Sequence, residues 1–151
     1  MSLTFDNLGN LGRLGNQMFQ YAALKGIAAN CGFDYRLPNQ KIQLYECFNF
    51  PKKFANKNDK VITHSSYEFD SNLFQNCLDD VDLWGFFQTE KYFKHIEKQS
   101  REAFTFVAEI GQPTEEAFKS NFGDSEVIAL QSYGIGIQNV RAASGVIMAA
   151  S

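Results

Sequence analysis

A glycine-rich turn that contains a cation and ends in an Asn–Gln pair stands close to the N-terminus, in the stretch GNLGRLGNQ at residues 9–17. Glycines let backbone N–H groups approach a ligand closely, and the first turn of a helix leaves such groups unpaired beside a partial positive charge. The arginine adds a forked cation that suits phosphate, and the amides add donors and acceptors for sugar hydroxyls. The stretch therefore predicts a site for a phosphate or diphosphate, whose candidate contacts are Gly12, Arg13, Gly15, Asn16 and Gln17.

Two other interpretations of this turn stay open. The glycines could simply turn a strand into a helix, with Asn16 and Gln17 as helix caps and Arg13 as an ordinary loop charge. The glycine spacing of three matches neither G-x-G-x-x-G nor G-x-x-x-x-G-K-[ST], so an NAD-binding Rossmann protein is the weaker alternative. The concentration of arginine, asparagine and glutamine at one helix start is what favours a ligand site.

The segments on both sides of the turn predict a strand–helix–strand unit. Leu3–Phe5 is a short apolar run typical of a strand, and Gln17–Asn30 has the periodicity of a helix. Gly32 stands where a helix C-terminal glycine is expected, and Phe33–Leu37 is a second predicted strand that Pro38 ends. This order predicts an α/β fold with a parallel sheet. The helix is expected to turn Met18, Phe19, Ala22, Ala23, Gly26 and Ile27 toward the core.

Further strands and helices are expected downstream. Residues 38–58 lack a clear periodicity and predict a loop with at most a short helix. Lys60–Thr63 predicts a strand, and Asp70–Asn76 predicts a helical turn. Asp82–Gln88 is a strongly apolar run that predicts a buried strand, with core positions at Trp84, Phe86 and Phe87.

A longer helix is predicted from about Glu90 to Phe106, with Thr89 as its N-cap. His95 is expected on its surface, and a short helix from Pro113 and a strand at Glu126–Leu130 are expected to follow. The inner face of the longer helix is predicted to comprise Phe93, Ile96, Ser100, Ala103 and Phe104.

Composition and charge narrow the classes of function. The net charge is −3, and the densest basic cluster, at residues 52–60, is interrupted by asparagine and aspartate, so no nucleic-acid partner is expected. Three widely spaced cysteines and two distant histidines indicate reduced thiols and no metal site. No run approaches the roughly 18 apolar residues of a membrane span, and no signal-peptide pattern is present. A cytoplasmic protein is expected, with peripheral membrane contact as an alternative.

Two longer stretches carry a resemblance to a known family. GRLGNQMFQYA at residues 12–22 closely resembles the N-terminal signature of the α-1,2-fucosyltransferases of glycosyltransferase family 11. WGFFQTEKYF at residues 84–93 resembles a second stretch of that family, in the family's order and at a plausible separation. Segments 37–50 and 93–106 also look like family segments, so the resemblance covers roughly residues 3–130.

The resemblance implies the N-terminal, acceptor-side half of a GT-B type glycosyltransferase, with a Rossmann-like lobe at residues 1–130. It implies GDP-fucose as donor, a galactose-containing glycan as acceptor, inversion at the fucose anomeric carbon, and no metal or other cofactor. Ligands of open α/β sheets bind beyond the carboxyl ends of the strands, where both motifs would lie. The residues that the resemblance places near the cleft are Gly12, Arg13, Gly15, Asn16, Gln17, Gln88, Thr89 and Glu90.

One region departs from the family pattern. In the family, the strand that matches residues 126–130 is followed by His-x-Arg-Arg-x-Asp, whose arginines would offset the charge of the diphosphate. Here Gln131 stands in place of the histidine, and the arginine pair and the aspartate are missing. Residues 131–151 are therefore interpreted as an atypical tail, truncated or out of frame, and weak or no activity is expected.

The remaining expectations concern the chain as a whole. No carboxylate pair stands out in the sequence, so no catalytic base is nominated. A non-catalytic remnant or glycan-binding module is the alternative to an enzyme. A lobe without its partner would expose an apolar inter-lobe face, and homo-oligomers would then be expected.

Overall fold

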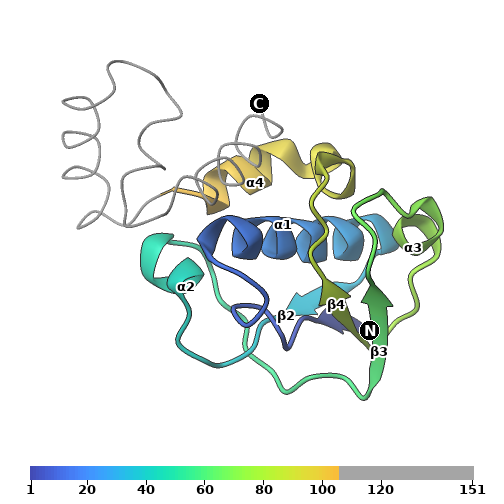
Figure 1. Cartoon of the computed structure of the whole chain (residues 1–151), viewed down its shortest axis with the longest axis horizontal. Coiled ribbons are helices and arrows are strands. Elements are labelled where there is room, and N and C mark those ends of the chain that lie inside the picture. The colour runs from blue at the N-terminus through green and yellow to red at the C-terminus, as the bar shows by residue number, and fades with distance from the viewer. Residues whose placement is uncertain (106–151) are drawn as a thin grey trace.

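Four parallel strands form one sheet in the order β2-β1-β4-β3 (Figure 1). The computed structural model describes residues 1–105. The strands are β1 (Ser2–Thr4), β2 (Asp34–Arg36), β3 (Lys60–His64) and β4 (Val81–Gly85). The α/β fold with an all-parallel sheet is thus confirmed. The predicted helix from Pro113, the predicted strand Glu126–Leu130 and the tail at residues 131–151 lie outside the described residues.

Helix α1 (Leu14–Cys31) connects β1 to β2 and is the central helix of the molecule. It begins three residues before the predicted start and ends, as predicted, at Gly32, whose φ of 73° is in the left-handed region. The prediction of a single inner face is incomplete, because Met18, Gln20, Tyr21 and Leu24 are buried as well. The sheet covers part of α1, and the helices α2, α3 and η1 contact other parts of it. A helix that is buried on nearly all sides does not need a polar face along its length, so residues outside the predicted face are buried too.

Two short helices flank α1. Helix α2 (Gln43–Cys47) lies within the predicted loop at residues 38–58, and α3 (Ser71–Asn76) confirms the predicted helical turn. Asp70 is the N-cap of α3, and its carboxylate accepts a hydrogen bond from the backbone N–H of Leu73 at 2.9 Å. Both helices contact α1, which thereby links the two edges of the sheet.

The predicted helix over residues 90–106 is wrong as a continuous element. The chain forms two 3₁₀ turns, η1 (Glu90–Tyr92) and η2 (Lys94–Ile96), before α4 (Glu97–Ala103). Tyr92 and Phe93 are adjacent, and both are fully buried. Tyr92 is the last residue of η1, and Phe93 lies between η1 and η2, so the two rings stand at the break in the predicted helix. All five residues predicted for the inner face are nevertheless buried: Phe93, Ile96, Ser100, Ala103 and Phe104.

The predicted strand over residues 82–88 is also shorter than expected. It ends at Gly85, and the following residues form a turn in which Phe87 has a φ of 54°. Phe87 is fully buried as predicted, whereas Trp84 and Phe86 are only half-buried. The turn, rather than a longer strand, therefore determines where the side chains beyond β4 point.

Candidate functional site

The glycine-rich turn joins β1 to α1 at the carboxyl edge of the sheet. Gly12 has a φ of 102°, and a β-carbon there would collide with the side chain of Asn16. Only glycine combines this backbone conformation with such a close approach. The predicted strand–glycine turn–helix geometry is confirmed, and it presents the N-terminus of α1 at the edge where ligands of parallel sheets bind.

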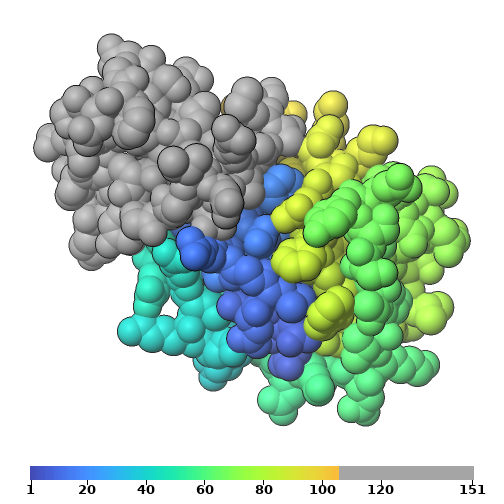
Figure 2. Space-filling model, in the orientation of Figure 1, coloured from blue at the N-terminus to red at the C-terminus, as the bar shows by residue number. Residues whose placement is uncertain are grey.

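A hydrogen bond joins the two stretches that carry the candidate residues. The amide nitrogen of Gln88 donates to the side-chain oxygen of Asn16, and the two residues are 72 positions apart in the sequence. Asn16 lies in the first turn of α1, and Gln88 lies in the turn that follows β4. Figure 2 shows the N-terminal segment in blue beside the yellow segment that follows β4. The structure thus brings together two candidates predicted from separate motifs.

Gln20, which the sequence analysis did not single out, holds the same two segments together. Its side-chain nitrogen donates to the carbonyl of Leu11 and to the carbonyl of Gly85, each at 3.1 Å. Gln20 is fully buried, and its Oε1 has no hydrogen-bond partner among residues 1–105. The sequence signal for Gln20 is a glutamine in the middle of an apolar helix. A buried amide needs hydrogen-bond partners, so such a residue is expected to bridge neighbouring segments.

The turn after β4 has unusual backbone geometry. Gly85 has a φ of 150°, and a β-carbon there would meet the carbonyl of His64 on β3. Phe87 has a φ of 54°, and its ring stacks on the His64 ring with centroids 5.1 Å apart. A non-glycine residue in this region costs on the order of 1–3 kcal/mol, and such residues cluster at functional sites. Burial of the Phe87 ring offsets this cost and fixes the direction of Gln88.

Gln17 and Gly15 lie beneath the surface of the site. The Gln17 side chain accepts a hydrogen bond from the backbone N–H of Leu44 at 2.9 Å and donates to the carbonyl of Gly12 at 3.4 Å. Both Gln17 and Gly15 are buried. Their observed contacts position the turn and link it to α2. Helix capping by Asn16 or Gln17 is wrong, because the N-cap is Arg13 and no side chain caps α1.

Arg13 is the exposed cation of the site. Its side chain has no hydrogen-bond or ion-pair partner among residues 1–105, and no acidic residue lies in the first turn of α1. The unpaired N–H groups and the positive end of the helix dipole are therefore not neutralised by a neighbouring carboxylate. A guanidinium beside such a helix end suits a phosphate group.

The last two candidates lie in the 3₁₀ turn η1. Thr89 is the N-cap of η1, as predicted, and its hydroxyl accepts a hydrogen bond from the Lys91 N–H at 3.5 Å. Glu90 is half-buried, and its carboxylate forms no hydrogen bond or ion pair within the described part of the chain. No observed contact joins Glu90 to Asn16 or Gln88 there, so the structure groups it with the site only through its neighbour Thr89.

A chain of hydrogen bonds connects the end of β3 to the start of α3. The backbone N–H of Asp70 donates to the Tyr92 hydroxyl at 2.8 Å, and that hydroxyl lies 3.2 Å from Nε2 of His64. Desolvation by burial raises the pKa of the Tyr92 hydroxyl. A neutral Tyr92 hydroxyl accepts a hydrogen bond from the Asp70 N–H and can donate one to Nε2 of His64. These contacts hold the His64 ring, which stacks on the Phe87 ring.

Two open hollows lie near strand ends in the described part of the chain. One, of about 430 Å³, is lined by residues 63–66 and 68–72, between the end of β3 and the start of α3. The other, of about 410 Å³, is lined by Asp6, residues 38–40 and residues 55–57, near the ends of β1 and β2. Neither lining includes Asn16 or Gln88.

Residues 1–105 contain neither a metal-binding cluster nor a membrane-spanning helix. Residues 1–105 contain no group of three or more His, Cys, Asp or Glu side chains that could hold a metal ion. No helix in this range has the length and apolarity required to cross a membrane.

Comparison of the chain with protein-family models, with curated proteins and with solved structures finds no match in any of the three.

Proposed function

We propose that the chain is the N-terminal, acceptor-side lobe of a GT-B type glycosyltransferase, an α-1,2-fucosyltransferase that uses GDP-fucose as donor and a galactose-containing glycan as acceptor. The observation that carries the proposal is the Asn16–Gln88 hydrogen bond at the carboxyl edge of the parallel sheet. It unites GRLGNQMFQYA and WGFFQTEKYF, the two stretches that resemble the fucosyltransferases, in one place. Convergence of two separate motifs is what a shared ligand site requires.

In this proposal, Arg13 and the N-terminus of α1 bind the diphosphate of the donor. The acceptor hydroxyl attacks the anomeric carbon of fucose on the face opposite the diphosphate and releases its proton to solvent water, while the bond from that carbon to the diphosphate oxygen breaks. Negative charge then accumulates on the departing GDP, where a fixed guanidinium and unpaired N–H groups stabilise it. Asn16 and Gln88 hold each other and offer their remaining donors and acceptors to sugar hydroxyls.

The sequence after residue 130 limits what this chain is expected to do. Because Gln131 replaces the histidine and the basic motif of the family is missing, we expect donor binding with weak or no turnover. Saturable galactoside binding by a chain that shows no turnover and does not bind GDP-fucose would favour the alternative, a non-catalytic remnant or glycan-binding module.

The test is calorimetric titration of the full chain with GDP-fucose and, separately, with GDP. One-to-one saturable binding is expected. Arg13→Ala should weaken it at least about tenfold, because a hydrogen bond to a charged group contributes about 1.5–3 kcal/mol. The matched control is Lys60→Ala, which removes an exposed cation at the opposite end of β3 and should leave binding unchanged.

Two results would overturn the donor-site proposal. One is no binding at millimolar nucleotide by a chain whose circular dichroism and cooperative melting show that it is folded. The other is equal affinity of the wild-type chain and the Arg13→Ala variant. Stoichiometric binding of NAD instead of GDP would revive the dinucleotide alternative.

A further inference from the structure

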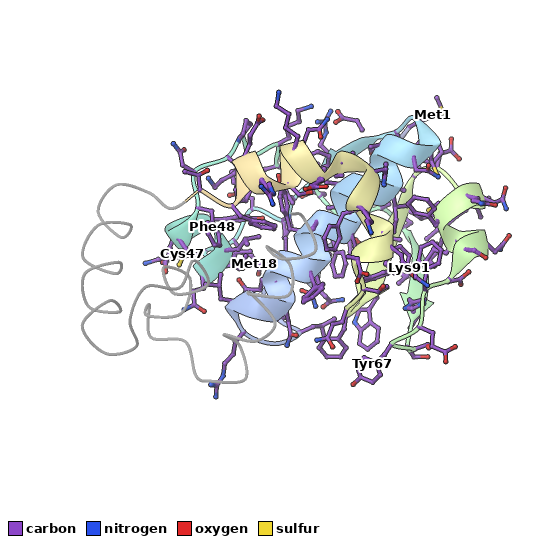
Figure 3. All side chains as sticks on the ribbon, turned by 90° about the horizontal axis from the view of Figure 1, so that it is seen from above. Met1, Met18, Cys47, Phe48, Tyr67 and Lys91 are labelled. Atoms are coloured by element: carbon purple, nitrogen blue, oxygen red, sulfur yellow. The ribbon has the colours of Figure 1, made fainter. Side chains whose placement is uncertain are left out.

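Two of the three cysteines stand at the ends of helices that contact each other. Cys31 is the last residue of α1, and Cys77 is the C-cap of α3. The helices α1 and α3 are in contact. Figure 3 shows the third cysteine, Cys47, in α2, across the molecule from α3. The fold thus brings together the two cysteines that are farthest apart in the sequence.

One carbonyl oxygen fixes the position of Cys31 relative to α3. The thiol of Cys31 donates to the backbone carbonyl of Phe74 at 3.5 Å, and the side-chain nitrogen of Asn30 donates to the same oxygen at 2.8 Å. A helical carbonyl points toward the next turn, which here is the turn that carries Cys77 and Leu78. The sulfur of Cys31 therefore lies beside the end of α3 at which Cys77 stands.

The two sulfurs also influence each other electrostatically. Desolvation by burial raises the pKa of Cys77 to about 11, and the charge of the nearby Cys31 adds to this rise. A charge interaction of this kind falls off with distance, so it agrees with the contact at Phe74. Cys31 is half-buried, whereas Cys77 is only 7% exposed. An oxidant in solution can therefore reach Cys31, while Cys77 is shielded from it.

We propose that Cys31 and Cys77 form a reversible redox site, at which a low-molecular-weight disulfide such as oxidised glutathione converts the two thiols into one protein disulfide. The new bond ties the C-terminal end of α1 to the end of α3. Both residues stand at helix ends, where the backbone adjusts more easily than within a helix, and a disulfide requires a specific geometry. The inference does not depend on the proposed function.

The oxidation consists of two thiol–disulfide exchanges. The Cys31 thiolate attacks one sulfur of oxidised glutathione, whose sulfur–sulfur bond breaks and releases one glutathione thiolate. The Cys77 thiolate then attacks the Cys31 sulfur and releases the second glutathione as a thiolate. The two released thiolates take up the protons that the two cysteines lose. Two electrons thus pass from the protein to oxidised glutathione, and excess reduced glutathione reverses both steps.

The test treats the full chain with oxidised glutathione at pH 8 overnight and maps the disulfides by peptide mass spectrometry. Trypsin separates the three cysteines, because lysine or arginine lies between each pair. In the folded chain the Cys31–Cys77 pairing should exceed Cys31–Cys47 at least about tenfold, since only the first pair lies together. In concentrated urea Cys31–Cys47 should instead exceed Cys31–Cys77 about fivefold, because the shorter loop closes more readily.

Single variants assign the two steps to their residues. Cys47→Ala is the matched control and should leave the Cys31–Cys77 disulfide unchanged. Cys77→Ala should leave a lasting glutathione adduct on Cys31, and Cys31→Ala should leave Cys77 largely unmodified. The oxidised wild-type chain should melt about 5–15 °C above the reduced chain, because the disulfide closes a long loop between two helices.

Any of three results refutes the redox site. The first is a folded wild-type chain that keeps glutathione on Cys31 and yields no Cys31–Cys77 peptide. The second is the same distribution of pairings in the folded chain and in the urea-unfolded chain. The third is a melting temperature that the disulfide leaves unchanged or lowers, since the native geometry would then oppose the bond.

Discussion

Gly12 illustrates how one residue without a side chain allows the site to form. Its backbone is in the left-handed region, and the Asn16 side chain occupies the space that a β-carbon would need. Asn16 in turn accepts the hydrogen bond from Gln88. Gly12 therefore acts by leaving room for the Asn16 side chain, and Asn16 links the turn after β1 to the turn after β4.

Gly12→Ala is expected to destabilise the fold by about 1–3 kcal/mol and to weaken GDP-fucose binding, because both the backbone and Asn16 must move. The control is Gly32→Ala, since Gly32 also has a positive φ but nothing lies within 4 Å of its β-carbon position. That variant should lose stability by about 1 kcal/mol and keep its affinity. Chemical denaturation and calorimetry measure the two effects, and equal affinity losses in both variants would refute the role of Asn16.

Helix α1 is the element that positions both sides of the site. Gln20 on α1 donates to carbonyls of the glycine turn and of β4, while Gly26 allows the helix to approach η1 closely. A β-carbon at Gly26 would overlap the carbonyl of Tyr92. Helix α1 thus contacts the end of β4 through the Gln20 side chain and contacts η1 through the backbone at Gly26.

Gln20→Met is expected to lower the free energy of unfolding by about 1–3 kcal/mol, because two carbonyls lose their donor. The removal of Oε1, which has no partner within residues 1–105, offsets a part of this loss. Urea denaturation measures the change in the free energy of unfolding. The control is Gln75→Met, at an exposed position of α3. A stability within about 0.5 kcal/mol of the wild type would show that water replaces the amide.

Gly26→Ala tests two opposing effects within α1. Helix propensity favours alanine by about 1 kcal/mol, whereas overlap with the Tyr92 carbonyl costs about 1–3 kcal/mol or more. We expect the overlap to dominate and the variant to unfold at lower urea. Ala29→Gly, at an exposed position of the same helix, measures the propensity effect alone. A more stable Gly26→Ala variant would mean that α1 and η1 can move apart at little cost.

Burial across the whole molecule determines the behaviour of the three thiols, all of which are free. Cys47 and Cys77 are buried, and desolvation raises the pKa of each to about 11, with smaller contributions from Glu46 for Cys47 and from Cys31 for Cys77. Cys31 is half-buried. The two buried thiols therefore report on the integrity of the fold at opposite ends of α1, because Cys47 belongs to α2 and Cys77 is the C-cap of α3.

At pH 8, Cys31 should react with a thiol reagent first, while the buried pair reacts slowly because only about 0.1% of each is thiolate. Timed alkylation followed by mass spectrometry of the peptides gives the three rates. Between about pH 9 and 11 the unfolded chain loses these protons before the folded chain does, so the free energy of unfolding should fall as the pH rises. Equal rates for the three thiols under native conditions would contradict the observed burial.

The sequence by itself determined the order of the elements and the location of the glycine turn. Leu3–Phe5, the helix ending at Gly32 and the strand near Lys60–Thr63 are local patterns of hydrophobicity and backbone preference, and such patterns act over a few residues. The candidates on the glycine turn follow from the same local pattern, because a turn between a strand and a helix presents its own N–H groups.

Only the tertiary structure decided which distant residues meet. The Asn16–Gln88 bond, the Gln20 bridge and the Cys31–Phe74 contact each join segments far apart in the chain, and no local pattern encodes such distances. The same holds for the break after Tyr92, where two 3₁₀ turns replace the start of the helix that the periodicity predicts. Packing of the described residues around α1 therefore decides which of the residues predicted from the sequence lie together.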